Sequence, residues 1–313
     1  MYKSIKSKPL FRVNFMNKIR NLLGIDRIHR NGINGSGVNV AVLDTGMYMH
    51  NDLSGSLVEF RDFVNGRQSA YDDNSHGTHV CGIIGASGRM SGGLYKGIAP
   101  AAGILPLKVL NHSGTGNPSD IISGIQWILR NHELWNIRVV NISIGTDSSK
   151  CEDESSLLVK SVDALWDAGL TVITSAGNNG PGYRSITTPG ISRKVITVGT
   201  NDIMSHTDEY GRKHTTYSGK GPTFCDISKP DIIAPGSHIV SCYPRAGGYA
   251  AKSGTSMSTP IVSGAAALAF SYNKTLTNDQ FKSLLCRTAD DVGLDRYTQG
   301  CGRINILRLL LSC

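Results

Sequence analysis

Short apolar runs alternate with longer amphipathic stretches along this chain. Five runs of four to six residues are nearly continuous in hydrophobicity, and each is followed by polar or glycine residues. Strands buried on both faces of a parallel sheet have this pattern, because helices cover each face. The predicted strands are Val38–Leu43, Ile104–Val109, Arg138–Ser143, Leu170–Ser175 and Val195–Val198.

The amphipathic stretches between these runs predict helices. Ser119–Arg130 places apolar residues at helical spacing and has Pro118 at its start, where a helix tolerates proline. Ser155–Ala168 repeats the pattern. Alternating strands and helices indicate an α/β fold, a doubly wound and mainly parallel sheet with helices on both faces. Functional side chains in such sheets gather at the carboxyl ends of the strands.

An acidic residue follows the first predicted strand. Val38–Leu43 leads directly into Asp44, Thr45 and Gly46. A carboxylate at a strand end can be partly buried and can orient a histidine. A solvated turn aspartate is the commoner explanation for such a residue taken alone.

Two histidines, His76 and His79, lie three residues apart after Asn74 and Ser75. We expect a short helix to begin at His76 with Ser75 as its cap. Zinc peptidase helices instead place two histidines four residues apart, with a glutamate beside the first. We therefore expect no metal site at these histidines.

A serine precedes a stretch of small and apolar residues near the end of the chain. Ser253–Pro260 leads into Ile261–Phe270, which is typical of a buried helix. Ser256 would then lie at a helix N-terminus, where free backbone N–H groups and the helix dipole favour negative charge. An ordinary helix cap is the alternative.

Taken together and in this order, the three segments resemble the subtilisin family of serine peptidases. The motifs are Asp44-Thr-Gly, His76-Gly-Thr-His-Val and Gly-Thr-Ser256-Met-Ser-Thr-Pro, and the resemblance runs from about Gly35 to Arg303. It implies a subtilisin-like fold and a serine endopeptidase that acts through an acyl-enzyme. Ser256 would be the nucleophile, His76 the general base and Asp44 the residue that orients His76. A catalytically silent relative that binds or regulates is the alternative.

The resemblance also implies an oxyanion hole and a substrate pocket. Asn178 matches the family's oxyanion-hole asparagine, although chemistry alone does not exclude Asn179. Thr187–Gly190 would close the floor of the pocket for the side chain before the scissile bond. The residues expected to wall this pocket are Ser143, Ile144, Gly145, Ser175, Ala176 and Gly177.

The resemblance makes Asp52 a calcium candidate, because many relatives bind calcium through a matching carboxylate. The loop 86–97 of this chain lacks the oxygen-rich residues that such a site needs. We expect no required cofactor.

The net charge of +8 is concentrated at the start of the chain. We expect residues 1–20 to form a basic N-terminal extension and residues 21–313 to form the catalytic domain. The remaining basic residues are dispersed and form no recognisable nucleic-acid-binding motif. The expected partners are therefore polypeptide substrates and not nucleic acid, and the sequence does not predict an oligomeric state.

Seven cysteines are dispersed along the chain and form no CxxC pair. An odd number without regular spacing favours reduced thiols in a reducing compartment. We see no apolar stretch typical of a secretory signal, and no run of ~18 apolar residues that would predict a membrane span. The expected location is the cytoplasm.

Overall fold

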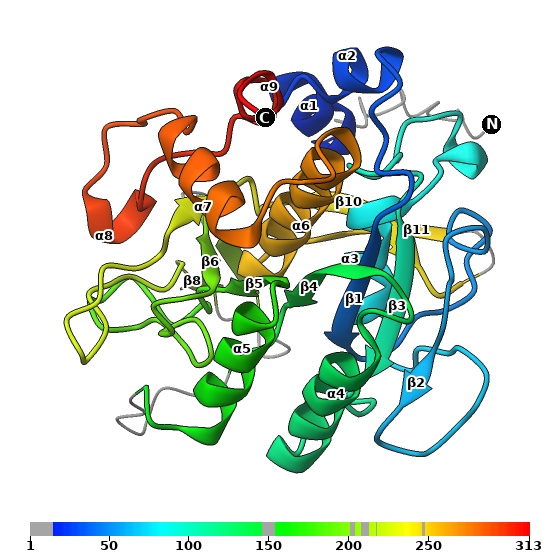
Figure 1. Cartoon of the computed structure of the whole chain (residues 1–313), viewed down its shortest axis with the longest axis horizontal. Coiled ribbons are helices and arrows are strands. Elements are labelled where there is room, and N and C mark those ends of the chain that lie inside the picture. Colours follow the sequence, from blue (N-terminus) through cyan, green and yellow to red (C-terminus); the bar gives the residue numbers. More distant parts are fainter. Residues whose placement is uncertain (1–14, 146–153, 201–203, 208–212, 217, 246–247) are drawn as a thin grey trace, which may run out of the picture.

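A seven-stranded sheet forms the centre of the molecule in the computed structural model (Figure 1), which describes residues 15–145, 154–200, 204–207, 213–216, 218–245 and 248–313. Every strand pairing in this sheet is parallel. In spatial order the strands are β2 (Arg61–Asp62), β3 (Gly103–Lys108), β1 (Asn39–Asp44), β4 (Ile137–Ile142), β5 (Thr171–Ser175), β6 (Ile196–Gly199) and β9 (Ile232–Ile233).

The five predicted strands are confirmed as β1, β3, β4, β5 and β6, with bounds shifted by one residue at most ends. All but the first or second residues of these strands are buried, as expected for central parallel strands. The edge strands β2 and β9 have only two residues each, which is too short for a hydrophobic pattern to reveal.

Helices pack on both faces of the sheet, which confirms the predicted α/β fold. On one face α3 (His76–Gly85) packs against α6 (Thr255–Tyr272), and both contact β1. On the other face α4 (Pro118–Asn131) packs against α5 (Leu157–Asp167). These last two helices match the predicted amphipathic stretches.

The small residues of α6 allow it to lie close to its neighbours. A Cβ atom at Gly264 would lie 2.6 Å from the Cβ atom of Ile98, so only glycine fits there. Nearly every residue of α6 from Thr255 to Phe270 is buried, and the helix contacts four strands of the central sheet. This packing fixes the position of its N-terminus, which begins immediately before Ser256.

The remaining elements surround this core. Two antiparallel hairpins lie outside the central sheet. The hairpin strands are β7 (Met204–Thr207), β8 (Lys213–Thr216), β10 (Ile239–Tyr243) and β11 (Gly248–Lys252), and the remaining helices are α1 (Phe15–Leu22), α2 (Ile25–Arg30), the 3₁₀ helix η1 (Arg89–Ser91), α7 (Asn278–Arg287), α8 (Arg296–Gln299) and α9 (Ile306–Leu311).

Helix α1 crosses the predicted boundary between extension and domain at residues 20 and 21. Met16 and Ile19 are buried in the main core, and Arg20 pairs with Asp26 and the carbonyl of Gly93. In Figure 1, α1 lies at the opposite end of the sheet from the tip of β1. The described part of the predicted extension is therefore packed on the domain, and residues 1–14 lie outside the described residues.

The prediction that all seven cysteines are reduced thiols is wrong. Cys286 and Cys301 form a disulfide bond, with their Cα atoms 5.1 Å apart. Helix α8 lies between them in sequence, and the chain turns back after it to meet α7. Disulfide formation depends on this spatial approach, which cysteine spacing does not reveal. Four other cysteines are free thiols, and Cys151 lies outside the described residues.

Candidate active site

Asp44 and His76 form a hydrogen-bonded pair at the carboxyl end of β1. Asp44 ends that strand and is fully buried, and His76 begins α3. The Nδ1 atom of His76 lies 2.8 Å and 2.9 Å from the two carboxylate oxygens of Asp44. A carboxylate only accepts hydrogen bonds, so the ring proton lies on Nδ1 and Nε2 is left free to accept a proton.

The first turn of α3 is held by side chains other than the predicted cap. Ser75 occupies the N-cap position, but its side chain makes no capping hydrogen bond, so this prediction is wrong. The carboxylate of Asp72 accepts instead from the backbone N–H groups of Ser75 and Thr78, both at 2.9 Å. The hydroxyl of Thr45 accepts from the N–H of Gly77 at 2.9 Å.

His79 has a structural environment. Its Nε2 atom lies 3.0 Å from the carbonyl oxygens of both Ile239 and Ala250, so Nε2 donates to the β10–β11 hairpin. Burial lowers the pKa of His79 to about 3, so the ring is neutral. A ring committed to two carbonyls holds the hairpin against α3.

Ser256 lies in the first turn of α6, as predicted. Its hydroxyl donates to the backbone carbonyl of Ser143 at 3.2 Å and makes no hydrogen bond with His76 among the described residues. The hydroxyl of Ser143 in turn donates to the carbonyl of Ser256 at 3.2 Å. Hydrogen bonds between catalytic groups often tighten only when substrate binds, so this geometry is compatible with transfer of the Ser256 proton to His76.

Asn178 lies against the same helix N-terminus. Its side-chain oxygen accepts from the N–H of Thr255 at 3.1 Å, which fixes the orientation of the amide. A Cβ atom at Gly254 would lie 3.5 Å from the Nδ2 atom of Asn178 and 3.8 Å from the backbone nitrogen of Ser256. Because glycine occupies position 254, these two donors border a space that a side chain would otherwise fill. A negatively charged oxygen between them would receive two hydrogen bonds.

A cavity of about 150 Å³ lies beside Ser256. The side chain of Thr187 is buried and lies between two glycines of its walls: a Cβ atom at Gly145 or at Gly177 would lie within 2.5 Å of it. The cavity is lined by Gly145, Ser175, Gly177, Asn178, Asn179, Thr187, Thr255 and Ser256.

One expected wall residue faces away from this cavity. Ala176 is fully buried and packs with Val159, Ile186 and Ile191 in a small separate cluster. Successive side chains of a strand point in opposite directions, so Ala176, which follows Ser175 at the end of β5, points away from the cavity that Ser175 lines.

A second cavity, of about 290 Å³, is lined by His76. Gly145 lines both cavities, so the cavity beside His76 and the cavity beside Ser256 share one wall residue. Ser143 and Ile144 line only this second cavity. Its other residues are Thr45, Asn74, Leu110, Ser113 and Gly114.

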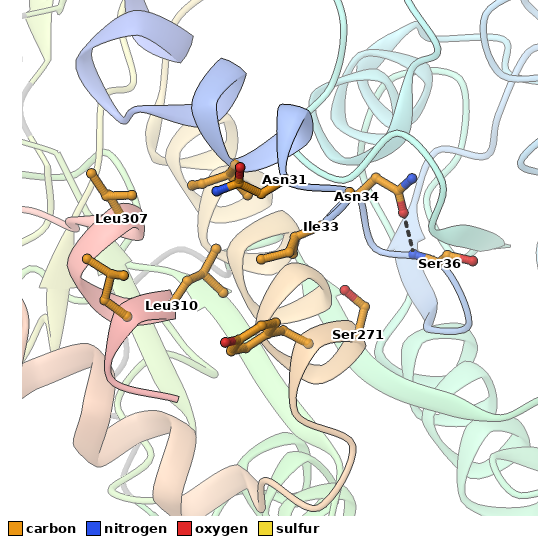
Figure 2. Close-up of a pocket in the computed structure, with 11 residues that line it drawn as sticks. Asn31, Ile33, Asn34, Ser36, Ser271, Leu307 and Leu310 are labelled. Atoms are coloured by element: carbon orange, nitrogen blue, oxygen red, sulfur yellow. Dashed lines mark hydrogen bonds between the residues drawn. The ribbon is translucent and has the colours of Figure 1, made fainter.

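A larger cavity, of about 460 Å³, lies where α2, α6 and α9 meet (Figure 2). Ser271 in its wall is 15 residues along α6 from Ser256, which corresponds to about 22 Å at the rise of an α-helix. The side chains of Ile33, Leu307 and Leu310 point into it, and none of its lining residues is an acid, a histidine or a cysteine. It lacks the groups needed for catalysis.

The carboxylate of Asp52 is engaged in hydrogen bonds within the protein. Asp52 is buried, and its carboxylate accepts from the hydroxyls of Ser87 and Tyr249 and from the N–H of Met90. The ligand-type side chains near it in the described structure are those of His50 and Cys242, within 4.8 Å. Calcium prefers six or more oxygen ligands, and the His50–Asp52–Cys242 set supplies only the carboxylate oxygens of Asp52.

The charges around His76 favour its protonated form. Burial lowers the pKa of His76, but the negative charge and hydrogen bond of Asp44 outweigh burial, and the pKa lies above its ordinary value of 6.5. Lys252 lowers this pKa and Asp72 raises it, both to a smaller extent. A histidine with this environment can accept a proton and remain stabilised as an imidazolium ion.

The parallel sheet, the hydrogen-bonded Asp44–His76 pair and a serine at a helix N-terminus are features of a hydrolase. Comparison with known proteins identifies the family. The pattern described as the subtilase family matches residues 35–303, and the chain therefore belongs to the subtilase family of serine endopeptidases.

Individual relatives agree with this assignment. The chain is 40% identical to serine protease AprX of Bacillus subtilis (strain 168) over 88% of this chain and 67% of that protein. It is 36% identical to subtilisin Savinase of Lederbergia lenta over 90% and 96% of the two chains. Among solved structures, sphericase superposes with a TM-score of 0.72 at 30% identity, covering 90% of this chain and 97% of that one.

Proposed function

We propose that Ser256 is the nucleophile of this endopeptidase, His76 its general base and Asp44 the residue that orients His76. The observation that carries the proposal is the pair of 2.8 Å and 2.9 Å contacts between His76 and Asp44, together with the position of Ser256 in the first turn of α6. In this assignment, Nε2 of His76 takes the Ser256 proton as Oγ bonds to the substrate carbonyl carbon. His76 then returns the proton to the leaving amine, and water completes the cycle by hydrolysing the acyl-enzyme.

Before attack, the Ser256 hydroxyl must leave the carbonyl of Ser143. That hydrogen bond is 3.2 Å long, which is at the weak end of hydroxyl hydrogen bonds. Rotation of the side chain about its Cα–Cβ bond exchanges this acceptor for Nε2 of His76. We propose Asn178 and the N–H of Ser256 as the donors that stabilise the oxyanion formed in this step.

The substrate is an extended polypeptide whose side chain before the scissile bond enters the 150 Å³ cavity. Ser143–Gly145 lies beside Ser256 and can pair with the substrate backbone, which gives affinity without strong sequence preference. The cavity is small, and Thr187 occupies the space between Gly145 and Gly177. Thr187 therefore limits the size of the side chain that this cavity accepts.

The reaction needs no metal in this proposal, because proton transfer and oxyanion stabilisation use only side-chain and backbone groups. Full activity in a calcium chelator is the expected result. The cytoplasmic location remains a prediction, and the Cys286–Cys301 bond removes one argument for it. Among the described helices, none has the length and apolar character to cross a membrane. Fractionation of cells would test the location.

The function is tested by hydrolysis of an unfolded protein substrate such as reduced casein. The purified chain should produce internal cleavages, and Ser256→Ala and His76→Ala should each lose almost all turnover. Asp44→Asn should lose less, because the imidazole remains near the serine in a poorer orientation. Equal turnover by the Ser256→Ala variant would contradict the assignment, and absence of turnover by the wild-type chain would favour a silent relative.

A further inference from the structure

A second carboxylate, Asp72, lies behind the Asp44–His76 pair. Only 8% of this residue is exposed. Its Oδ1 atom accepts from the hydroxyl of Thr45 at 2.9 Å and from the N–H groups of Asn74 at 3.0 Å and Ser75 at 2.9 Å. Its Oδ2 atom accepts from the N–H and hydroxyl of Thr78 at 2.9 Å and 2.5 Å. A carboxylate has about four lone-pair positions, so Asp72 is fully used as an acceptor.

These donors lie on both sides of His76 in the sequence. Ser75, immediately before it, has a φ of 94°, a left-handed conformation that is strained for a residue with a side chain. The bond from its N–H to Asp72 helps to hold it there. Loss of this carboxylate would let the turn relax and move the imidazole that follows it.

Thr45 connects the two carboxylates. Its backbone N–H donates to Asp44 at 2.7 Å, and its hydroxyl donates to Asp72 at 2.9 Å. The same hydroxyl accepts from the N–H of Gly77, the residue after His76. The position of His76 relative to Asp44 is therefore held through Thr45 and Asp72 together.

A cation on the neighbouring hairpin opposes the charge of Asp72. Lys252 ends β11 and donates from Nζ to the hydroxyl of Ser75 at 2.9 Å. The charged or titratable groups that act on the ring of His76 are Asp44, Asp72, Lys252 and, on its own helix, the neutral His79. Lys252 lowers the pKa of His76, whereas Asp72 raises it.

We propose that Asp72 is a positioning residue of the active site, which holds the turn carrying His76 and balances the charge of Lys252 beside the imidazole. The inference rests on the proposed roles of Asp44, His76 and Ser256. Asp72 touches no reacting atom and acts only through His76.

Asp72→Asn tests both effects, because it removes the charge and replaces an acceptor by an amide donor. We expect kcat/KM to fall by about 10- to 100-fold, the scale of loss that misplacement of a catalytic group causes. The low-pH limb of the kcat/KM profile should also move to lower pH, since loss of a negative charge disfavours the imidazolium ion. A residue needed only for folding would not move this limb.

Two further variants separate geometry from charge. Thr45→Val removes the connecting hydroxyl and keeps both carboxylates, so we expect a lower kcat with the limb near its original pH. Lys252→Met removes the opposing cation, so the limb should move to higher pH, and Lys252→Arg should restore it. Should Asp72→Asn fail to fold, the Lys252 and Thr45 variants test the same arrangement from its other side.

Unmoved limbs in Asp72→Asn and Lys252→Met, or unchanged kcat/KM in Asp72→Asn, would overturn the inference. The proposed function is checked separately by reacting each variant with a fluorophosphonate, which labels an activated serine. A wild-type chain that is not labelled would contradict the proposed function itself. A labelled wild-type chain with unmoved limbs would contradict only the role of Asp72.

Discussion

Replacement of Thr187 by glycine is expected to enlarge the range of side chains accepted before the scissile bond. Thr187 is 3% exposed, and its Oγ1 atom is buried without a hydrogen-bond partner. A Cβ atom at Gly145 would lie 2.5 Å from the side chain of Thr187, and a Cβ atom at Gly177 would lie 2.4 Å from it. Thr187 therefore fills the floor of the proposed pocket without strong polar anchoring.

The size of the effect follows from the volume that is released. Thr187→Gly removes three heavy atoms from the floor, which leaves room for about two additional methylene groups of a substrate. Burial of each methylene contributes about 0.8 kcal/mol, so a leucine side chain gains about 1.6 kcal/mol relative to alanine. This corresponds to about a 15-fold increase in the leucine-to-alanine ratio of kcat/KM.

The assay compares kcat/KM for two peptide p-nitroanilides that differ only in alanine or leucine before the scissile bond. Thr187→Val is the matched control, because it keeps the shape of the side chain and removes only the unpartnered hydroxyl. We expect the valine variant to retain the wild-type ratio. A glycine variant with that same ratio would refute the placement of Thr187 at the pocket floor.

Three other predictions concern catalysis and stability. Asn178→Ala should lower kcat by about 10²–10³-fold with little change in KM, which is the loss that removal of one oxyanion-hole donor causes in a subtilisin. Asn179→Ala should keep most activity. The reverse result would assign the oxyanion-hole role to Asn179. Asp44 raises the pKa of His76 above 6.5, so activity should fall as the pH decreases through that pKa, because the protonated ring cannot act as a base. A loss of activity that begins only below pH 6.5 would contradict this environment of His76. The disulfide is tested in a Ser256→Ala background, which prevents self-digestion. Replacing both Cys286 and Cys301 by alanine should lower the free energy of unfolding in urea by about 3 kcal/mol, because the bond closes a loop of 15 residues. An unchanged unfolding midpoint, together with seven reactive thiols in the denatured, unreduced chain, would contradict the disulfide.

The main strands and helices of this fold, and the candidate catalytic residues at their ends, could be predicted from the local pattern of hydrophobic and polar residues. Asp44 closes a buried strand and Ser256 opens a buried helix, and both boundaries follow from a change in hydrophobicity within a few residues. The parallel sheet then brings such ends to one edge. The pairing of His76 with Asp44 needed the combined motifs, because neither residue alone identifies its partner.

The supporting residues could not be predicted, because their roles depend on contacts between distant segments. Lys252 reaches Ser75 across 177 positions in the sequence, and no periodicity marks either residue. Thr187 belongs to the pocket only because the chain returns beside Gly145 and Gly177. Ala176 was misplaced for a simpler reason, since the alternation of an extended segment turns it away from its neighbours.

The central claim is that Ser256 is a nucleophile activated by His76 and Asp44. Reaction with a fluorophosphonate, followed by mass spectrometry of the digested chain, tests this most directly. The account predicts one label per chain, on Ser256, with no labelling of Ser256→Ala and greatly slowed labelling of His76→Ala. Labelling of another residue, or equal labelling of the Ser256→Ala variant, would contradict the claim.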